Sequence, residues 1–193
     1  MKRKLLLWAI LLGGMTSYGQ DFSKNSLFVG LGLGMSENSE INGVGTNWTI
    51  GYQNDIRNTR FKLVRSIRFG TYTDILIQDI PQTHFNSINL NVNLNFDFFN
   101  VRGFSVFIGS GLTGNFNFGL IGSGGWYERL SSNHFRDFNL AINGLSGFRL
   151  NPSKKRIGYE LLLFPVSFGL NDSSFLELSV VQMRVIIKLF DSP

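Results

Sequence analysis

The chain of 193 residues is long enough for one domain, and only 16% of its residues are charged, against a usual share of about 25%. It contains no cysteine, which excludes disulfides, thiolate metal sites, a cysteine nucleophile and a lipoprotein anchor. The formal net charge is +5, but three of the 18 basic residues lie in the first four positions, and the other 15 against 13 acidic residues are too few to indicate nucleic-acid binding.

The first twenty residues have the layout of a secretory signal peptide. Basic residues at positions 2–4 precede an apolar run from Leu5 to Leu12, and Ser17 and Gly19 supply small residues at the two positions that signal peptidase reads. The apolar run is too short for a membrane anchor, which needs about 18 apolar residues or more. We therefore expect residues 1–19 to be a cleaved signal peptide and residues 20–193 to be one exported domain.

The rest of the chain alternates between apolar and polar or small residues, which is the period of a β-strand. The first such segment runs from Leu27 to Met35, where large apolar residues alternate with glycines. The clearest runs from Ile88 to Phe98, with asparagines and one aspartate between the apolar residues. A strand that crosses a membrane needs about 9–11 residues. In chain order, the predicted strands cover 27–35, 43–53, 60–72, 85–98, 103–117, 136–150, 156–169 and 175–190.

Two of these segments are less regular. The segment 60–72 places Arg65 among the apolar positions, where a charge at mid-depth in lipid would cost about 2–4 kcal/mol. We therefore expect Arg65 to lie near an interface, to contact a partner, or to mark a shift in the alternation of the strand. The segment 156–169 is apolar on both faces after Glu160 and contains Pro165, which predicts a β-bulge.

The predicted connections differ in length. Connections 36–42, 73–84, 118–135 and 170–174 alternate with 54–59, 99–102 and 151–155; three of the first set are longer, and 118–135 is the longest. Outer-membrane barrels have long outer loops and short periplasmic turns. We expect the first set outside the cell, and both ends of the domain in the periplasm because the strand count is even.

Alternation also occurs in soluble β-proteins, so the chemistry of the polar face has to decide between the two. That face is largely glycine, asparagine, serine and threonine, which suits a crowded barrel interior better than a hydrated surface. A sheet in hydrocarbon must close, because every backbone group there needs a hydrogen bond. Aromatic residues near the strand ends predict interfacial girdles: Tyr52, Tyr72, Phe98, Phe99, Phe104, Phe116, Phe118, Phe138, Phe148 and Phe190.

On these features the chain resembles the small outer-membrane β-barrel proteins of Bacteroidota, often described as PorT-like, and its architecture is similar to OmpA and OmpX barrels. The resemblance covers residues 27–190 and rests on the alternation, the strand number and the Tyr18-Gly19-Gln20 ending of the leader. It implies an all-β fold, an eight-stranded antiparallel up-and-down transmembrane β-barrel in outer-membrane lipid.

The charged residues of the strands fall mostly on the inward face. An eight-stranded barrel is just wide enough for side chains to fill it. Opposed charges in such a lumen should pair, because an unpaired buried charge is costly. We expect a lumen plugged by salt bridges and amides rather than a general porin. Its expected charge network is Lys62, Arg68, Asp97, Arg149, Glu160, Arg184 and Lys188, with Glu177 as a further candidate.

The sequence offers little catalytic chemistry. His84 and His134 are the only histidines, and both fall in predicted outer loops. Residues 131–134 are serine, serine, asparagine and histidine, the residue types with which some outer-membrane barrel enzymes cut or transfer acyl chains. Adjacent residues, however, rarely form a catalytic triad. We expect a solvated loop there, with no catalytic, metal or cofactor site. Trp126 and Tyr127, in a glycine-rich loop, would either bind a partner or cover the barrel mouth.

Four functional hypotheses remain at this point. The preferred one is a non-enzymatic structural or accessory subunit of a larger envelope complex, with outer-membrane lipid and envelope proteins as partners. The others are a narrow channel or small-ligand transporter, a lipid-modifying barrel enzyme, and a soluble periplasmic β-protein. A fold alone does not choose among them.

Overall fold

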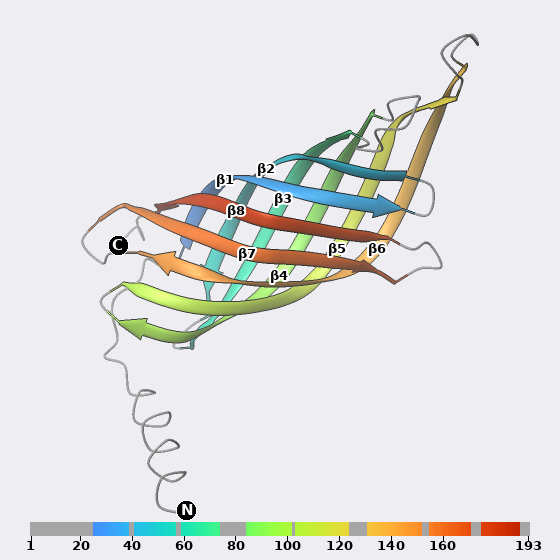
Figure 1. The fold of residues 1–193 in the computed structure, drawn as a ribbon. Helices are drawn as coiled ribbons and strands as arrows, with labels where there is room; N and C mark the ends of the chain where they lie inside the picture. The colour runs from blue at the N-terminus through green and yellow to red at the C-terminus, as the bar shows by residue number, and fades with distance from the viewer. Residues whose placement is uncertain are drawn as a thin grey trace, which may run out of the picture.

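A computed structural model describes residues 25–38, 41–56, 59–73, 84–101, 103–123, 131–151, 155–170 and 175–189. These residues form eight strands, which are β1 (Asn25–Asn38), β2 (Ile41–Asp55), β3 (Phe61–Thr73), β4 (His84–Val101), β5 (Phe104–Ser123), β6 (Ser131–Leu150), β7 (Ile157–Gly169) and β8 (Leu176–Lys188). Each strand pairs antiparallel with the next, and β8 pairs with β1, so the sheet is a closed barrel (Figure 1). The predicted fold class is confirmed; the predicted signal peptide lies outside the described residues.

The two ends of the described chain meet at one end of the barrel. The backbone N–H of Leu189 donates to the carbonyl oxygen of Asn25 at 3.0 Å. We call this the terminal end; the connections 56–60, 102–103 and 151–156 also lie there, because they join strands that meet at that end. The other connections lie at the opposite end, which we call the far end.

The distribution of side chains is the reverse of that in a soluble protein. Leucine, valine, isoleucine and phenylalanine side chains cover the outside of the strands, whereas most of the buried side chains are polar or charged. In β1, for example, Leu31 and Leu33 are exposed, while Gly32 and Gly34 face the interior. This is the arrangement of a barrel whose outer face contacts lipid. Among the described residues no helix is long and apolar enough to cross a membrane.

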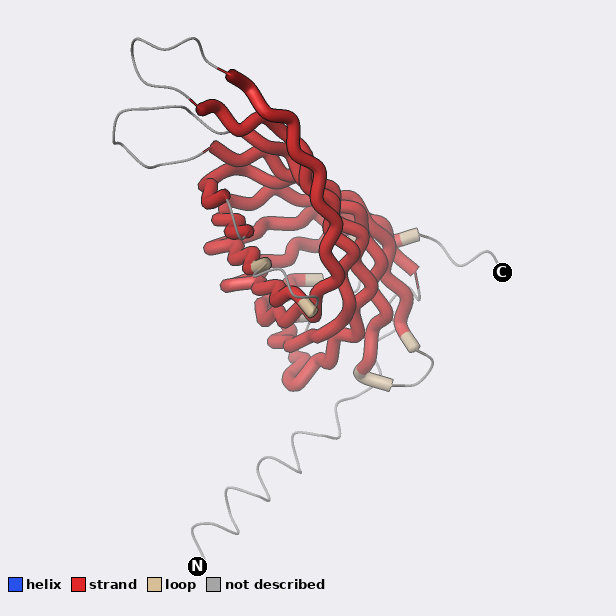
Figure 2. Tube along the Cα trace, turned by 90° about the vertical axis from the view of Figure 1, so that its right-hand side faces the viewer, coloured by secondary structure: helices blue, strands red, loops and turns tan. Residues whose placement is uncertain are grey.

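Five strands, β1, β2, β4, β5 and β6, extend further than the sequence predicted, chiefly at the far end, whereas β7 and β8 are slightly shorter than predicted. β1 and β2 remain paired as far as Asn38 and Ile41, so the predicted connection 36–42 is wrong. β5 and β6 remain paired as far as Ser123 and Ser131, which replaces most of the predicted connection 118–135. The longest connection is therefore 74–83. β5 and β6 project beyond β7 and β8 as a raised wall (Figures 1 and 2). The alternation of side chains repeats along a strand, but it does not mark the residue at which the strand ends.

The predicted bulge in β7 is confirmed. The register of β6 against β7 shifts between Gly144 and Ser146, where Phe164 and Pro165 form the irregular stretch. Phe164 adopts a φ of 49°, in the left-handed region that bulky residues rarely enter. Pro165 has no N–H to donate, and the bulge removes it from a ladder position that would need one.

Three small groups of apolar side chains lie inside the barrel. Phe28 packs with Val64 and Ile186, Phe107 packs with Leu145 and Leu162, and Tyr72 packs with Phe85. The prediction that Tyr72 belongs to an interfacial girdle is wrong, because its side chain is fully buried in the lumen. Tyr72 lies an even number of residues from Lys62 and Arg68, so its side chain points into the barrel as theirs do, although it lies near the end of the strand. Phe190 of the predicted girdle lies outside the described residues.

Glycines make room for these rings in a narrow barrel. Gly51 lies opposite Phe28 in the β1–β2 register, and a Cβ atom at Gly51 would lie 2.7 Å from Cε1 of Phe28 and 2.6 Å from the carbonyl oxygen of Arg65. Neither distance is sustainable, so the ring occupies the space that a side chain would need.

We predict that Gly51→Ala lowers the free energy of unfolding by about 1–3 kcal/mol, because the methyl group displaces Phe28 or the β3 backbone. The matched control is Gly114→Ala, where a Cβ atom would meet only ring carbons of Phe138 at 3.7 Å or more. The control should change stability by less than about 0.5 kcal/mol. Urea unfolding of the refolded protein in lipid vesicles measures both, and equal losses would contradict the packing role of Gly51.

Candidate functional site in the barrel lumen

The lumen contains two groups of ion pairs with a layer of amides and hydroxyls between them. The first group, which we call the terminal cluster, lies toward the terminal end and draws on six of the eight strands. Its members are Asp55, Lys62, Asp97, Arg149, Glu160 and Arg184. Each of them is one of the alternate residues of its strand whose side chains point into the barrel, and each lies near the terminal end of that strand.

Arg149 is the centre of the terminal cluster. Its Nη1 donates to Oδ1 of Asp97 at 2.7 Å, and its Nε donates to Oε1 of Glu160 at 2.5 Å. The guanidinium also lies over the Phe107 ring, 4.5 Å from its centroid. With only 1% of its surface exposed, Arg149 has exchanged its hydration shell for two carboxylates and a ring face.

Both carboxylates also serve a second cation. Oε2 of Glu160 lies 3.5 Å from Nη1 of Arg184, whose guanidinium lies over the Phe28 ring at 4.6 Å. Oδ2 of Asp97 lies 4.0 Å from Nζ of Lys62, which pairs with Asp55 on the neighbouring strand. The cluster is thus a continuous chain of alternating charge inside the bore.

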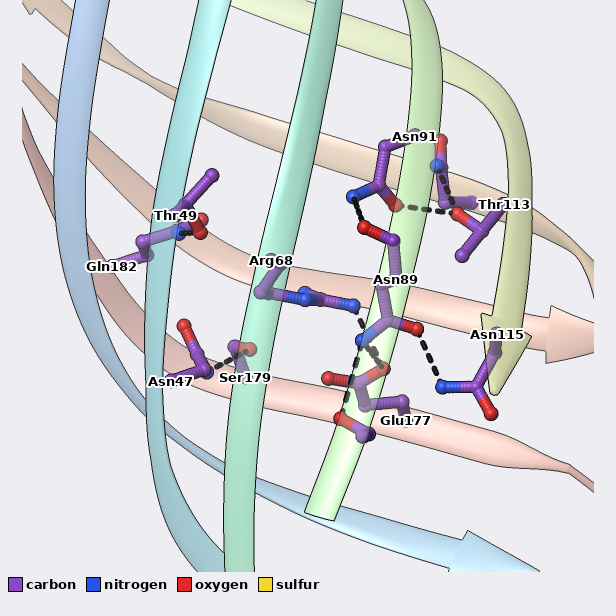
Figure 3. A network of polar contacts seen from close by, with 12 residues as sticks. Asn47, Thr49, Arg68, Asn89, Asn91, Thr113, Asn115, Glu177, Ser179 and Gln182 are labelled. Atoms are coloured by element: carbon purple, nitrogen blue, oxygen red, sulfur yellow. Dashed lines mark hydrogen bonds and ion pairs between the residues drawn. The ribbon is translucent and has the colours of Figure 1, made fainter. Parts of the chain in front are cut away.

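The second group, the far cluster, consists of Arg68, Tyr72, Asn89 and Glu177. Nη2 of Arg68 donates to Oε2 of Glu177 at 2.7 Å, and the Tyr72 hydroxyl donates to Oε1 of the same carboxylate at 2.8 Å. Nδ2 of Asn89 donates to Oε2 at 3.2 Å (Figure 3). Next to this carboxylate the rings of Tyr72, Phe85 and Phe135 pack in sequence, with centroid separations of 5.1 and 6.1 Å.

Hydrogen bonds between side chains link the strands in the layer between the two clusters. Nδ2 of Asn143 donates to the Thr113 hydroxyl at 2.6 Å, and that hydroxyl donates to Oδ1 of Asn91 at 2.7 Å. Figure 3 shows the bond between Thr113 and Asn91 beside a bond from Nδ2 of Asn115 to Oδ1 of Asn89, at 2.5 Å. On the other side of the barrel, Nε2 of Gln182 donates to the Thr49 hydroxyl at 2.5 Å.

A small pocket remains in this middle layer. It is lined by side chains that include Arg68, Asn93, Asn143 and Arg184, and its volume for the centre of a water molecule is about 20 Å³. Nε of Arg68, Nε of Arg184 and the Oδ1 atoms of the two asparagines have no hydrogen-bond partner among the described side chains. A single water needs about 10–15 Å³ and two to four polar partners, so we expect one or two bound waters rather than a continuous column.

The charges of the two clusters balance. Their ion-paired residues are four basic and four acidic side chains. No excess charge is left among these described residues to attract an ion of either sign, and most of their side chains are buried inside the barrel. Chemically the lumen can hold the barrel walls together and hold a little water.

Most of the residues expected in the charge network lie in these clusters. They are Lys62, Arg68, Asp97, Arg149, Glu160 and Arg184, and Glu177 is the carboxylate of the far cluster. Lys188 has the inward phase but lies half-exposed at the terminal mouth. Sequence reasoning missed Asp55 and Tyr72 as members. Tyr72 lies on the predicted strand an even number of residues from Arg68, so counting along that strand would have placed it inward. Asp55 lies beyond the predicted end of its strand at residue 53, so it could be found only once β2 was seen to extend to Asp55.

The two histidines lie on strands and not in loops, which corrects that expectation. His84 of β4 and His134 of β6 both stand opposite Leu120 of β5, so the three residues share one row of the register. Nδ1 of His84 lies 3.1 Å from the Thr73 hydroxyl. Trp126 and Tyr127, expected to bind a partner or cover the mouth, lie outside the described residues.

Arg65 faces outward without any shift of phase. It stands between Tyr52 and Val92 in register, closer to the terminal end than to the far end of β3. From there the long side chain can extend toward the interface, which makes a charge on the lipid face less costly than at mid-depth. Among the described residues no group of histidine and carboxylate side chains could hold a metal ion.

Comparisons with known proteins identify the fold. No family model and no curated protein matches the chain. Among solved structures, Neisserial surface protein A aligns with a TM-score of 0.63 and 13% identity, over 86% of this chain and 98% of that one. A major outer membrane protein from Thermus thermophilus gives 0.57 and 10%, over 84% and 98%. Ail, the attachment invasion locus protein of Yersinia pestis, gives 0.51 and 12%, over 86% and 100%. The chain has the fold of small outer-membrane β-barrels.

We predict that Arg68 and Glu177 are strongly coupled in stability. Arg68→Leu leaves a buried carboxylate, and Glu177→Gln leaves a buried guanidinium, so each should cost about 3–5 kcal/mol. The double variant leaves no charge, and the glutamine oxygen can still accept from Tyr72 or Asn89, so it should be more stable than either single variant. Urea unfolding in lipid vesicles gives the three values, and additive losses would show that the pair is not coupled.

Proposed function

We propose that the protein is an integral outer-membrane β-barrel that serves as a structural or accessory subunit of a larger envelope assembly. In this proposal the terminal end of the barrel faces the periplasm. The far end, where β5 and β6 project beyond the other strands, faces the outside of the cell. The shared fold with outer-membrane barrels and the apolar outer face support the location. The resemblance to PorT-like barrels of Bacteroidota supports an accessory role in secretion, assembly or transport.

The observation that carries the proposal is the blocked lumen. Two charge-balanced clusters of mostly buried ion pairs lie across the bore, and the pocket between them offers about 20 Å³ to the centres of water molecules. A barrel that offers solutes no path has to act through its outer wall, its rims or its loops. We therefore rank the narrow channel second, as the function that measurable conductance would favour.

The positions of the histidines support a non-enzymatic role. A lipid-acting enzyme needs a histidine within hydrogen-bond reach of a nucleophile and of an orienting acid or amide. His84 has a threonine hydroxyl beside it, but no carboxylate stands on the outward face of the described parts of β3 to β6. Unchanged lipid A and phospholipid masses after deletion of the protein would agree with this part of the proposal.

We predict that the refolded protein gives no stepwise conductance for water-soluble ions in planar lipid bilayers. The reason is that two layers of paired side chains would have to separate before an ion could pass. Arg149→Ala combined with Arg184→Ala removes both guanidiniums that lie over rings in the terminal cluster, and it should raise ion leakage if it folds. A porin in the same bilayers serves as the positive control. Conductance by the unmodified protein would overturn the sealed-lumen proposal and favour a channel.

We also predict that extraction of native membranes with a mild detergent recovers the protein together with other envelope proteins in fixed proportion. The control is extraction of an OmpA-type barrel from the same membranes. Recovery of the protein alone, as a monomer, would contradict the subunit proposal while leaving the membrane location intact. Recovery in the soluble fraction would contradict the location itself.

A further inference from the structure

The outer apolar face of β3 to β6 ends abruptly near the far end. The last wholly apolar row across these strands is Phe69, Ile88, Phe116 and Phe138, which stand opposite one another in register. The next row of the same phase is Thr71, Asn86, Phe118 and Arg136, and the row beyond it is Thr73, His84, Leu120 and His134. Polar residues thus begin within one step of the aromatic edge.

Four exposed side chains in these two rows can donate hydrogen bonds away from the barrel. We call Asn86, Arg136, His84 and His134 the rim patch. The Thr71 hydroxyl donates to Oδ1 of Asn86 at 3.0 Å, which leaves the Nδ2 group of that asparagine directed elsewhere. His84 contacts the Thr73 hydroxyl through Nδ1, so its other ring nitrogen is the one that can meet a ligand.

The charge of this surface is of one sign. Within the described parts of β3 to β6 no aspartate or glutamate lies on the outward face, whereas Arg136 is exposed there. On the β1–β2 side of the barrel the same two rows continue through Thr46 and Leu33 and through Val44 and Met35, none of which is charged, and the next outward residue of β1 is Glu37. The basic character is therefore confined to one flank.

The spacing of the rim patch matches a phosphorylated headgroup. Strands lie about 4.8 Å apart, so Asn86 and Arg136, two strands apart in one row, are separated by about 10 Å at the backbone. His134 stands two residues from Arg136 along β6, at about 7 Å. Arginine is suited to phosphate because its fork of N–H groups can bind two oxygens together.

We propose that the rim patch binds a phosphate of an anionic membrane lipid whose acyl chains lie against Phe116, Phe138 and Leu140 below it. This rests on the proposed membrane location. The charge of Arg136 draws the phosphate to the edge of the aromatic row, Asn86 and the histidines donate to its remaining oxygens, and the apolar rows directly beneath accept the chains. A soluble phosphate would use the donors alone, so the adjoining apolar surface favours a lipid.

The test uses the full mature chain refolded in dodecyl maltoside, with folding verified by its altered mobility on unheated gels. The folded protein is titrated with diphosphorylated lipid A, with dephosphorylated lipid A and with inorganic phosphate, and bound lipid is measured by native mass spectrometry. We expect the dephosphorylated lipid to bind at least about tenfold more weakly, and inorganic phosphate to displace lipid A only at far higher concentration.

Arg136→Gln should lower the affinity for diphosphorylated lipid A about tenfold, and Asn86→Leu should lower it by a smaller factor. The matched control is Arg65→Gln, which removes an outward arginine nearer the opposite end of the barrel and should leave the affinity unchanged. Equal affinity for both forms of lipid A, an unchanged affinity of Arg136→Gln, or an equal loss in Arg65→Gln would overturn the proposal. Displacement of the lipid by inorganic phosphate at matching concentration would also overturn it.

Failure of this inference is separable from failure of the proposed function. A protein that folds into phosphatidylcholine vesicles but does not discriminate between the two forms of lipid A is still a membrane barrel without a rim site. A protein that folds only without lipid or detergent contradicts the membrane location first.

Discussion

A closed sheet of eight strands leaves so little space inside that most inward charged and polar side chains have to find partners among other inward side chains. Little room is left there for water, because side chains fill the interior of an eight-stranded barrel and the pocket of the middle layer offers only about 20 Å³ to water centres. The charges therefore have to balance, and the amides have to bond from strand to strand. The inward glycines, the asparagines of β4 and the placement of aromatic rings against arginines all follow from this shortage of space.

Which side chains point into the barrel could largely be predicted from the alternation along each strand. The alternation in β4 identifies its inward asparagines and Asp97 without any structural knowledge, and the same count identifies Arg149 and Glu160. Which partner each charge selects could not be predicted, since Arg149 on β6 bonds Asp97 on β4, two strands away in the sheet. Pairing of that kind depends on stagger and strand tilt, which alternation does not encode.

The errors share a physical origin as well. The girdle prediction for Tyr72 rests on the preference of tyrosines for membrane interfaces, yet a phenol whose hydroxyl can reach Glu177 is equally satisfied inside. The predicted connections are too long because glycine, serine and asparagine mark turns in soluble proteins. In a raised hairpin such as that of β5 and β6 the same residues extend a ladder beyond the last apolar row. Composition is a weak guide where a strand passes from lipid to water.

The closure of β8 on β1 has a consequence for how the molecule is made. Seven of the eight strand pairs join segments adjacent in sequence, but the eighth joins Ser26 to Lys188, nearly the whole length of the domain. Until the last strand arrives, both margins of the sheet expose unpaired backbone, which hydrocarbon does not tolerate. The barrel therefore cannot close before the polypeptide is complete, and in hydrocarbon the two unpaired edges of the sheet would need a chaperone or a template strand until then. Such a high contact order makes assembly slow on its own and suits it to a catalysed, late step.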